Sequence, residues 1–555
     1  MRLDAVGIEV MAHAFASVAE EMGLVLVHSA LSPNIRERRD ASAALFDADG
    51  EMIAQAAHIP VHLGALADAV VAVRELEPRP GELFILNDPY AGGSHLPDLT
   101  LIGAIEIEGM VGGYSVVRAH HSDVGGMTPG SMPAGARELY QEGIVIPPTR
   151  LTHDVERMLL ANVRTPAMRR GDLAAQRAAV ERGAEGLRAL ARRHGWAALH
   201  EAAGELLAYA ERRTKAVLGR MTAEGTATDF LEGDGVIDED LKIRVAVTIR
   251  DGIFHADFTG TRGAARGNVN CPIAVTRSAV LFVVRTLLPD DVPMNGGVPR
   301  AIRVTAPAGC LVNARRPSAV AAGNVETSQR IADTVFRALA SAGCDVPAQG
   351  QGTMNNVTFG GAASRESGAW TYYETIGGGQ GASRGANGPS GVHVGMSNTR
   401  NTPIEVLELE HPLYVRTYAL RRGSGGTGQW NGGDGVVREI EALAPMETTL
   451  LTERRRHGAA GNAGGSDGRP GINRLNDAPV ASKATLRLAA GDVLRIETPG
   501  GGGWGRALHP AEQAEEQDRE DEGRDRHITA VAFEIKAQQR ERHAGDRGPD
   551  QQHQP

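Results

Sequence analysis

The stretch from Asn87 to Gly126 constrains this chain most, because it places two groups of metal-ligand side chains at the two ends of one predicted hairpin. Leu99–Ile107 and Tyr114–Ala119 alternate in polarity as paired strands do, and the polar, glycine-containing segment 108–113 separates them. A hairpin brings its outer ends together, so we expect the two groups to meet at one end of a sheet. The groups are Asp88, His95 and Asp98 before the hairpin, and His120, His121 and Asp123 after it.

These residue types predict a metal site with mixed nitrogen and oxygen ligands. His95, Asp98 and His120 with one further carboxylate supply four ligands of the kind that Zn²⁺ or Mn²⁺ accepts, whereas Ca²⁺ prefers oxygen alone. The alternative is that each side chain caps a turn or ties a loop by hydrogen bonds. Along an extended strand His120 and His121 point to opposite faces, so regular geometry admits only one of them and does not say which.

Composition excludes several classes of partner. The net charge of −10 argues against nucleic acid and against an anionic membrane surface. No apolar run approaches the ~20 residues that span a bilayer, and the first ten residues carry acids where a secretory signal is basic. We therefore expect a cytoplasmic protein. Three widely spaced cysteines without a CxxC pair indicate reduced thiols.

Hydrophobic periodicity predicts an α+β chain in several layers: an N-terminal helix and hairpin region with the metal site, a helical middle and a β-rich C-terminal half. We expect domains at 1–222 and 223–506, followed by a disordered acidic tail at 507–555. The expected helices are Ile8–Ser29, one ending near Glu77, two within 166–221 that separate at Gly195, Ala274–Leu288 and Gly323–Ala342. The expected strands include Ala43–Asp47, Leu83–Leu86, the segments around the Asp251-Gly252 turn, and Leu407–Leu420.

Other chemistry has weaker support in the sequence. Three glycine-rich segments, at 377–381, 423–435 and 500–505, lack a following lysine, and no GxxxxGK[ST] phosphate loop occurs. We interpret these glycines as turn or bulge residues. Ser94 and Ser122 flank the histidines, but no GxSxG nucleophile elbow is present, and Cys271 has no neighbouring histidine in the sequence.

Long motifs in this chain resemble the hydantoinase B/oxoprolinase family. The resemblance is collinear from about residue 3 to 507 and omits only the acidic tail. The motifs are SPNIRERRDASAALFD (32–47), HIPVHLGAL (58–66), NDPYAGGSHLPD (87–98), RAHHSDVGG (118–126), NVRTPAMRRGDLAAQ (162–176), FTGT (258–261), DVPMNGG (291–297), NTRNTPIEVLE (398–408), the 422–435 loop and PGGGGWG (499–505).

The resemblance implies a metal site made of His95, Asp98, His120 and a carboxylate from the first hairpin region. It favours His120 over His121 as the ligand. For the carboxylate we expect Glu37, with Asp40 as the alternative. His121 and Asp123 are then expected to serve in catalysis, with Asp123 orienting a ligand or shuttling a proton.

The family also implies a function and a partner. Its members are the B-type subunits of N-methylhydantoinases, the second half of 5-oxoprolinases and the alpha subunit of acetone carboxylases. They work beside an A-type subunit with an actin-like ATPase fold, which binds ATP. We therefore expect a metal-dependent catalytic subunit of an ATP-dependent hydrolase of small cyclic amides, in a hetero-oligomer such as two plus two. The alternatives are a subunit of an ATP-dependent ketone carboxylase and a non-catalytic scaffold for the ATPase.

Overall fold

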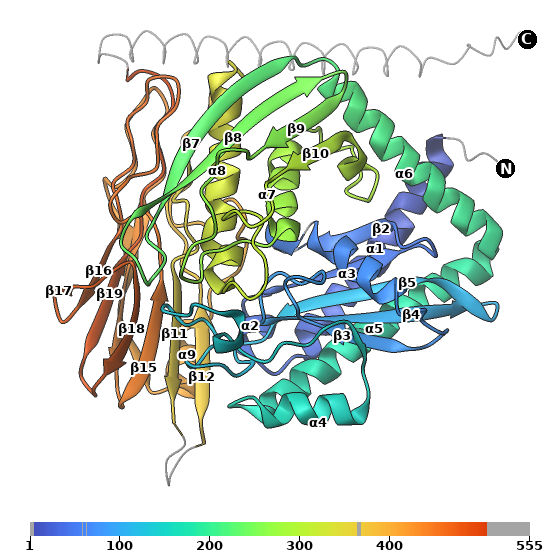
Figure 1. Cartoon of the computed structure of the whole chain (residues 1–555), viewed down its shortest axis with the longest axis horizontal. Coiled ribbons are helices and arrows are strands. Elements are labelled where there is room, and N and C mark those ends of the chain that lie inside the picture. Colours follow the sequence, from blue (N-terminus) through green and yellow to red (C-terminus); the bar gives the residue numbers. More distant parts are fainter. Residues whose placement is uncertain (1–4, 58, 63, 363–367, 508–555) are drawn as a thin grey trace, which may run out of the picture. The chain divides into compact units, whose positions relative to one another are not determined.

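Helices and sheets alternate along the chain in the computed structural model, which describes residues 5–57, 59–62, 64–362 and 368–507 (Figure 1). This confirms the predicted α+β class. The helices are α1 (Ala5–Ser29), α2 (Pro33–Arg36), α3 (Ala65–Arg74), α4 (His153–Ala161), α5 (Pro166–His194), α6 (Trp196–Leu218), α7 (Ile273–Thr286), α8 (Ser328–Ser341) and α9 (Ile404–Glu410). Short 3₁₀ turns lie at η1 (Pro60–His62), η2 (Leu139–Gln141) and η3 (Val298–Ala301), and a π-helical turn, η4 (Gly323–Thr327), leads into α8.

The predicted hairpin lies in the middle of the first sheet. The strand order is β2-β1-β5-β4-β3-β6. The strands are β1 (Ala41–Phe46), β2 (Met52–Ala57), β3 (Leu83–Leu86), β4 (Asp98–Ile107), β5 (Met110–His120) and β6 (Thr149–Arg150). The pairing of β4 with β5 sets Asp98 directly opposite His120, so the two outer ends of the hairpin meet as expected.

The turn of this hairpin is shorter than predicted. Glu108 and Gly109 both adopt positive φ, 54° and 79°, as a two-residue turn between twisted strands requires. Pairing therefore continues to Ile107 and Met110, and β5 begins four residues earlier than the polarity pattern suggested.

Both faces of the first sheet are covered. The side chains of Phe15 and Met22 on α1 belong to one apolar cluster with Leu101 of β4 and with residues of α5 and α6. On the other face, Val70 of α3 packs in a second cluster with Phe84. Because both faces are buried, the strands are apolar along nearly their whole length, and a polar side chain at a strand end is held in a dry environment.

The second sheet packs against α7 and α8 (Figure 1). Its order is β10-β9-β8-β7, and Asp251-Gly252 forms the predicted tight turn with φ of 53° and 74°. The strands are β7 (Ala223–Glu232), β8 (Asp240–Arg250), β9 (Ile253–Asp257) and β10 (Ile302–Thr305). The η4 turn and α8 bring Asn324 and Val325 to the wall of the cavity that Asp98 also lines.

Two further antiparallel sheets follow, as the predicted β-rich C-terminal half requires. One has the order β12-β11-β15-β18 and the other β13-β14-β19-β16-β17. Their strands are β11 (Asn356–Gly361), β12 (Trp370–Glu374), β13 (Leu413–Arg421), β14 (Gly435–Ala442), β15 (Met446–Leu451), β16 (Ile472–Leu475), β17 (Ala478–Pro479), β18 (Lys483–Leu488) and β19 (Val493–Glu497).

One predicted strand is wrong over its first residues. Residues 407–410 belong to α9, and the strand begins only at Leu413. The sequence IEVLELE alternates as a strand does, but Pro403 occupies the N-cap and Pro412 follows the last turn, which are helix start and stop signals. Helix α4 was not predicted either.

The glycine-rich segments also differ from the sequence interpretation. Of the glycines at 377–381, 423–435 and 500–505, only Gly423 and Gly505 have positive φ. The others allow backbones to approach closely: a Cβ on Gly379 would lie 2.0 Å from the carbonyl oxygen of Gly433. These segments hydrogen-bond to one another, as in the 2.9 Å bond from the Gly501 N–H to the Gly433 oxygen.

Helix α1 corrects one expectation from composition. The helical stretch Val6–Ser29 is long and apolar enough to cross a membrane by length and composition, with a mean hydropathy of 1.5 in its best window. It is the one helix of that kind in the described part of the chain. Its side chains at Phe15, Met22 and Leu26 are buried in the protein core.

The described residues up to Gly505 form one compact unit. The predicted boundary at 222/223 falls between α6 and β7. Residues 508–555, nearly all of the predicted acidic tail, lie outside the described residues.

Candidate metal centre

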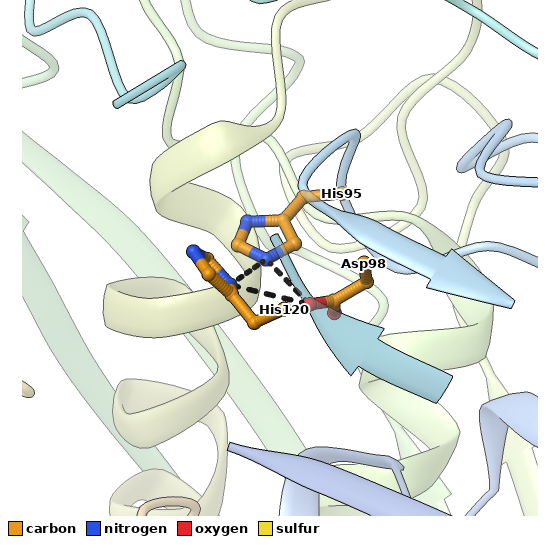
Figure 2. A group of neighbouring side chains, drawn as sticks. All are labelled: His95, Asp98 and His120. Carbon is orange, nitrogen blue, oxygen red and sulfur yellow. Dashed lines mark hydrogen bonds and ion pairs between the residues drawn. The ribbon is translucent and has the colours of Figure 1, made fainter. Parts of the chain in front are cut away.

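Three predicted ligands meet at the open end of the β4–β5 hairpin. His95 Nε2 lies 3.1 Å from Asp98 Oδ1 and 3.2 Å from His120 Nδ1, and His120 Nδ1 lies 3.3 Å from Asp98 Oδ1 (Figure 2). The three atoms thus form a nearly equilateral triangle. All three side chains are buried.

This triangle has the dimensions of a divalent-metal ligand set. Ligand atoms bonded to one Zn²⁺ at about 2.0–2.2 Å are roughly 2.8–3.6 Å apart when the bond angles are about 90–110°. Within the described chain, Asp98 Oδ1, the carboxylate corner of the triangle, is buried without a hydrogen bond of regular geometry, which is costly unless something else satisfies it. Two imidazoles and a carboxylate suit Zn²⁺ or Mn²⁺, so the residues fit such an ion.

A tight turn explains why His95 and Asp98 converge although three residues separate them. The Asp98 N–H donates to the His95 carbonyl at 3.1 Å, and the His121 N–H donates to the Pro97 carbonyl at 2.8 Å. Asn87 fixes the start of this turn, because its side-chain amide donates to the Leu96 carbonyl at 2.8 Å. The turn is therefore tied both to the strand that precedes it and to the strand that it faces.

The charges in the triangle favour an ionised Asp98 between imidazoles. Burial alone would raise the pKa of Asp98, but the charge of His95 and hydrogen bonds with His120 and His62 hold it well below its usual value. Burial lowers the pKa of His120 and keeps its ring neutral. For His95, burial is outweighed by the charge and hydrogen bond of Asp98, which raise its pKa. A cation between these groups replaces that proton in stabilising the carboxylate.

The second oxygen of Asp98 is held by side chains that the sequence analysis did not assign to the site. Ser94 Oγ donates to Asp98 Oδ2, and His62 Nε2 lies 3.3 Å from the same oxygen. His62 is itself bonded to Ser42 Oγ at 3.0 Å through Nδ1. His62 occurs in the HIPVH segment and Ser42 on β1, so only the folded sheet brings them to Asp98. The sequence analysis had no signal that His62 would reach Asp98.

A buried carboxylate orients His95 from further away. His95 Nδ1 lies 3.2 Å from the Ala321 carbonyl, and the N–H groups of Val320 and Ala321 donate to Glu142 at 2.8–3.1 Å. Glu142 is fully buried, and burial raises its pKa to about 8 against the opposing effect of these N–H groups. By holding the peptide that faces His95, Glu142 sets which ring nitrogen points into the triangle.

We expect Glu142→Ala to weaken metal binding roughly 10–100-fold, because no side chain then accepts the Val320 and Ala321 N–H groups that hold the segment facing His95. Titration of the purified variant with Zn²⁺, with thermal denaturation as the control for folding, measures this. Unchanged affinity would show that His95 needs no such support.

The two candidates for the fourth ligand lie in different surroundings. Glu37 Oε1 accepts a 2.8 Å bond from Arg36, and the side chain is about one-quarter exposed. Asp40 is buried and lines the same cavity as Asp98 and His120. Its backbone carbonyl accepts the His120 N–H at 3.0 Å, which ties the end of β5 to the residue before β1. Only Asp40 of the two is therefore beside the triangle.

The other predicted site residues do not reach the triangle. His121 points to the opposite face and bonds to Gln176 at 2.9 Å, and burial lowers its pKa to about 4. Asp123 accepts the N–H groups of Gly125 and Gly130 and pairs with Arg164 at 2.9 Å, so it organises the following loop. Asp88 pairs with Arg316 in the same manner.

The candidate nucleophiles are otherwise engaged. Ser94 donates to Asp98 as described above, and Ser122 accepts a 2.8 Å bond from Arg169. Cys271 is buried, which raises the pKa of its thiol to about 12 and keeps it protonated.

A small cavity of ≈ 20 Å³, room for about one water molecule, adjoins the triangle. Asp98 and His120 form one wall, and Tyr373 stacks on the His120 ring at a centroid distance of 4.5 Å. Asp40, His62 and Asn324 also line it. The other lining residues are apolar side chains and hydroxyls from several distant segments: Ile59, Val61, Val325, Met354, Thr375, Ser397 and Thr399. The cavity therefore places the triangle beside side chains from the C-terminal half of the chain.

Comparison with known proteins identifies the family. The family model described as hydantoinase B/oxoprolinase matches residues 4–507. The chain belongs to the hydantoinase B/oxoprolinase family. Membership of this family explains why the motifs that contain His95, Asp98 and His120 could be recognised together in the sequence.

Named relatives in this family include enzymes and one enzyme subunit. A 5-oxoprolinase 1 of Arabidopsis thaliana is 36% identical; the match covers 90% of this chain but only 42% of the relative. A Pseudomonas protein named, provisionally, as the B-type subunit of a D-/L-hydantoinase is 30% identical, with 91% of each chain covered. In the crystal structure of the ATP-dependent caprolactamase of Pseudomonas jessenii, one chain superposes with a TM-score of 0.85 at 27% identity, covering 93% of this chain and 94% of that one. The present chain thus spans about two-fifths of the 5-oxoprolinase.

Proposed function

We propose that this chain is the metal-dependent catalytic subunit of an ATP-dependent cyclic-amide hydrolase. The single observation that carries the proposal is the buried His95–Asp98–His120 triangle at the wall of a cavity. Two imidazoles and a carboxylate buried within 3.3 Å of one another are costly to build, and such clusters are concentrated at functional sites. The names of the three relatives above, all for enzymes or subunits that act on cyclic amides, support the same chemistry.

We assign His95, Asp98 and His120 as metal ligands, with Asp40 as the fourth. Bound there, Zn²⁺ or Mn²⁺ would supply Lewis-acid chemistry by lowering the pKa of water and polarising a carbonyl oxygen. Asp98 holds the charge of the centre, and Ser94 and His62 fix its orientation through Oδ2. His62, at the cavity wall, is placed to hold a proton on Nε2 and to donate it in a hydrogen bond to Asp98 Oδ2.

ATP enters the reaction through a partner in this proposal. Ring opening of an unstrained lactam is slow, so phosphorylation of the ring carbonyl oxygen would provide a good leaving group before water attacks the carbonyl carbon. This chain lacks a phosphate loop motif, and the Pseudomonas hydantoinase relative is named as one subunit of its enzyme. An A-type subunit with an actin-like ATPase fold would supply the nucleotide site, in a cytoplasmic hetero-oligomer such as two plus two.

The test is reconstitution with the A-type partner. We expect ATP-dependent opening of at least one of 5-oxoproline, hydantoin and caprolactam, measured as ring-opened product and phosphate released. Chelation should lower the rate at least ~100-fold, and Zn²⁺ or Mn²⁺ should restore it, since the ligand set supplies the reactive water only when loaded.

Three outcomes would contradict the proposal. Full turnover by metal-free enzyme would remove the metal from the mechanism. A purified chain without bound metal that still stabilises its ATPase partner would favour the scaffold alternative. Carboxylation of a ketone, without opening of any lactam, would favour the carboxylase alternative.

A further inference from the structure

Three hydroxyl groups line the same cavity as the triangle. Thr375 follows β12, and Ser397 and Thr399 lie in the segment before α9. All three are buried and line the same cavity as Asp98 and His120. The cavity therefore brings hydroxyls from the C-terminal half together with metal-ligand side chains from the first sheet.

A buried cation lies behind these hydroxyls. Arg38 is fully buried, and its guanidinium donates to the carbonyls of Tyr373 and Arg400 and to the side-chain oxygen of Asn34 at 2.7–3.3 Å. Its Nη2 donates to Thr375 Oγ1 at 2.5 Å and to Thr399 Oγ1 at 3.1 Å. All of these acceptors are neutral. The hydrogen bonds therefore satisfy the N–H donors of the Arg38 guanidinium but do not offset its positive charge.

The hydroxyls continue into a chain that passes through a histidine. Thr375 Oγ1 lies 2.7 Å from Thr399 Oγ1, which lies 3.2 Å from His393 Nε2. His393 Nδ1 lies 3.0 Å from Ser397 Oγ. Burial, with the charge of Arg38, lowers the pKa of His393 to about 3, so the ring is neutral and carries one proton.

The number of protons in this hydrogen-bond chain shows how many of its hydroxyls remain free to donate into the cavity. Three hydroxyls and one neutral imidazole carry one proton each, and the three contacts between them use one proton each. One proton is left over. Thr399 already accepts from Arg38, so its two lone pairs leave room for only one more donor, and the spare O–H lies at an end of the chain. Either end, Thr375 or Ser397, is a cavity-lining hydroxyl.

We propose that the Thr375–Thr399–His393–Ser397 chain, backed by Arg38, is a subsite that binds a negatively charged oxygen of the substrate in the cavity that adjoins the metal triangle. The inference rests on the proposed function for the identity of that substrate. A hydroxyl donor hydrogen-bonded to a buried guanidinium favours an oxyanion over a neutral carbonyl oxygen. The oxygen belongs either to the phosphoryl group of the activated lactam or to a carboxylate on the lactam ring.

His393 is a positioning residue in this arrangement. Its two tautomers place the spare O–H at opposite ends: with the proton on Nδ1 the free hydroxyl is Ser397, and with the proton on Nε2 it is Thr375. The subsite therefore offers a donor to an oxyanion at either position without a change in charge.

Binding measurements on the metal-loaded protein test the subsite separately from catalysis. Calorimetry with inorganic phosphate, 5-oxoproline and its decarboxylated analogue 2-pyrrolidone would compare wild type with Ser397→Ala and with the double variant Thr375→Val/Ser397→Ala. We expect the double variant to bind oxyanions at least ~10-fold more weakly, because both terminal donors are gone, and S397A to lie between it and wild type. Thr375→Ser, which keeps the hydroxyl, should bind as wild type does.

The probes also separate the two sources of the oxyanion. A loss confined to inorganic phosphate assigns the subsite to the phosphoryl group, and a loss confined to 5-oxoproline, with 2-pyrrolidone unaffected, assigns it to a ring carboxylate. Wild-type affinity in the double variant at unchanged metal content would overturn the inference, as would a wild-type protein that binds neither oxyanion at millimolar concentration. If the double variant fails to fold or to hold metal, the affinity of S397A tests the inference instead. The Ser397 hydroxyl accepts no hydrogen bond from Arg38, so its removal leaves the Arg38 contacts in place. Absence of lactam opening in the reconstituted wild type is a separate result that overturns the proposed function alone.

Discussion

Replacing Asp98 with asparagine is expected to remove the bound metal and to lower ring-opening activity well beyond the ~10–100-fold that loss of an outer-shell partner costs. One oxygen of Asp98 lies within 3.1–3.3 Å of both triangle imidazoles, and the other is held by Ser94 and His62. An amide removes the negative charge that offsets a divalent cation. It also presents an N–H₂ group to partners that include another donor, the Ser94 hydroxyl.

Metal content by elemental analysis and turnover by the reconstituted enzyme check this expectation. Glu37→Gln is the matched control, because Glu37 pairs with Arg36 near the surface; it should keep both metal and activity. Asp40→Asn should fall between the two, since Asp40 lines the cavity beside the triangle. Full metal occupancy in D98N, or loss of metal in E37Q alone, would show that the ligand set is assigned wrongly.

The metal-ligand triangle could be predicted because its residues lie close to one hairpin in the sequence. Two groups of ligand-type residues flank one hairpin, and antiparallel pairing makes the ends of a hairpin neighbours whatever the rest of the fold does. Asp98 and His120 are directly opposite each other for this reason. Strand alternation also settles that His120 and His121 point to opposite faces, although it took the resemblance to say which face holds the site.

The rest of the cavity could not be predicted because its residues come from segments hundreds of positions apart. Thr375 and Thr399 meet Arg38 across more than 300 residues, and Asn324 reaches Asp98 from a π-helical turn. No spacing rule connects such residues. Likewise, Glu37 and Asp40 have similar sequence surroundings, and only the turn after α2 directs one carboxylate outward and buries the other.

The glycine segments show a different limit of sequence reasoning. The sequence does not distinguish a glycine that is needed for positive φ from one that is needed for close backbone approach. Only the segment packed against the glycine distinguishes the two roles. At Gly501, the neighbour is the Gln380 peptide, 121 positions earlier in the sequence.

Gly501→Ala is therefore expected to destabilise the fold by roughly 3 kcal/mol or more, at the upper end of overpacking effects. The new Cβ would lie 2.0 Å from the carbonyl oxygen of Gln380 and 2.3 Å from its carbon. That carbonyl cannot move away without cost, because it accepts the Gly433 N–H at 2.8 Å, while the Gln380 N–H donates to Pro389 at 3.0 Å. Relief of the clash thus breaks hydrogen bonds between buried backbones.

Gly204→Ala is the matched control with the opposite sign. Gly204 is exposed within α6, and no atom lies within 4 Å of the Cβ that alanine would add. Alanine should raise stability by about 0.5–1 kcal/mol, because glycine in a helix interior loses more backbone entropy on folding. Thermal midpoints at one fixed scan rate compare the two variants with wild type. Equal midpoints for G501A and wild type would mean that the glycine segments repack freely, and the steric reason given for their composition would be wrong.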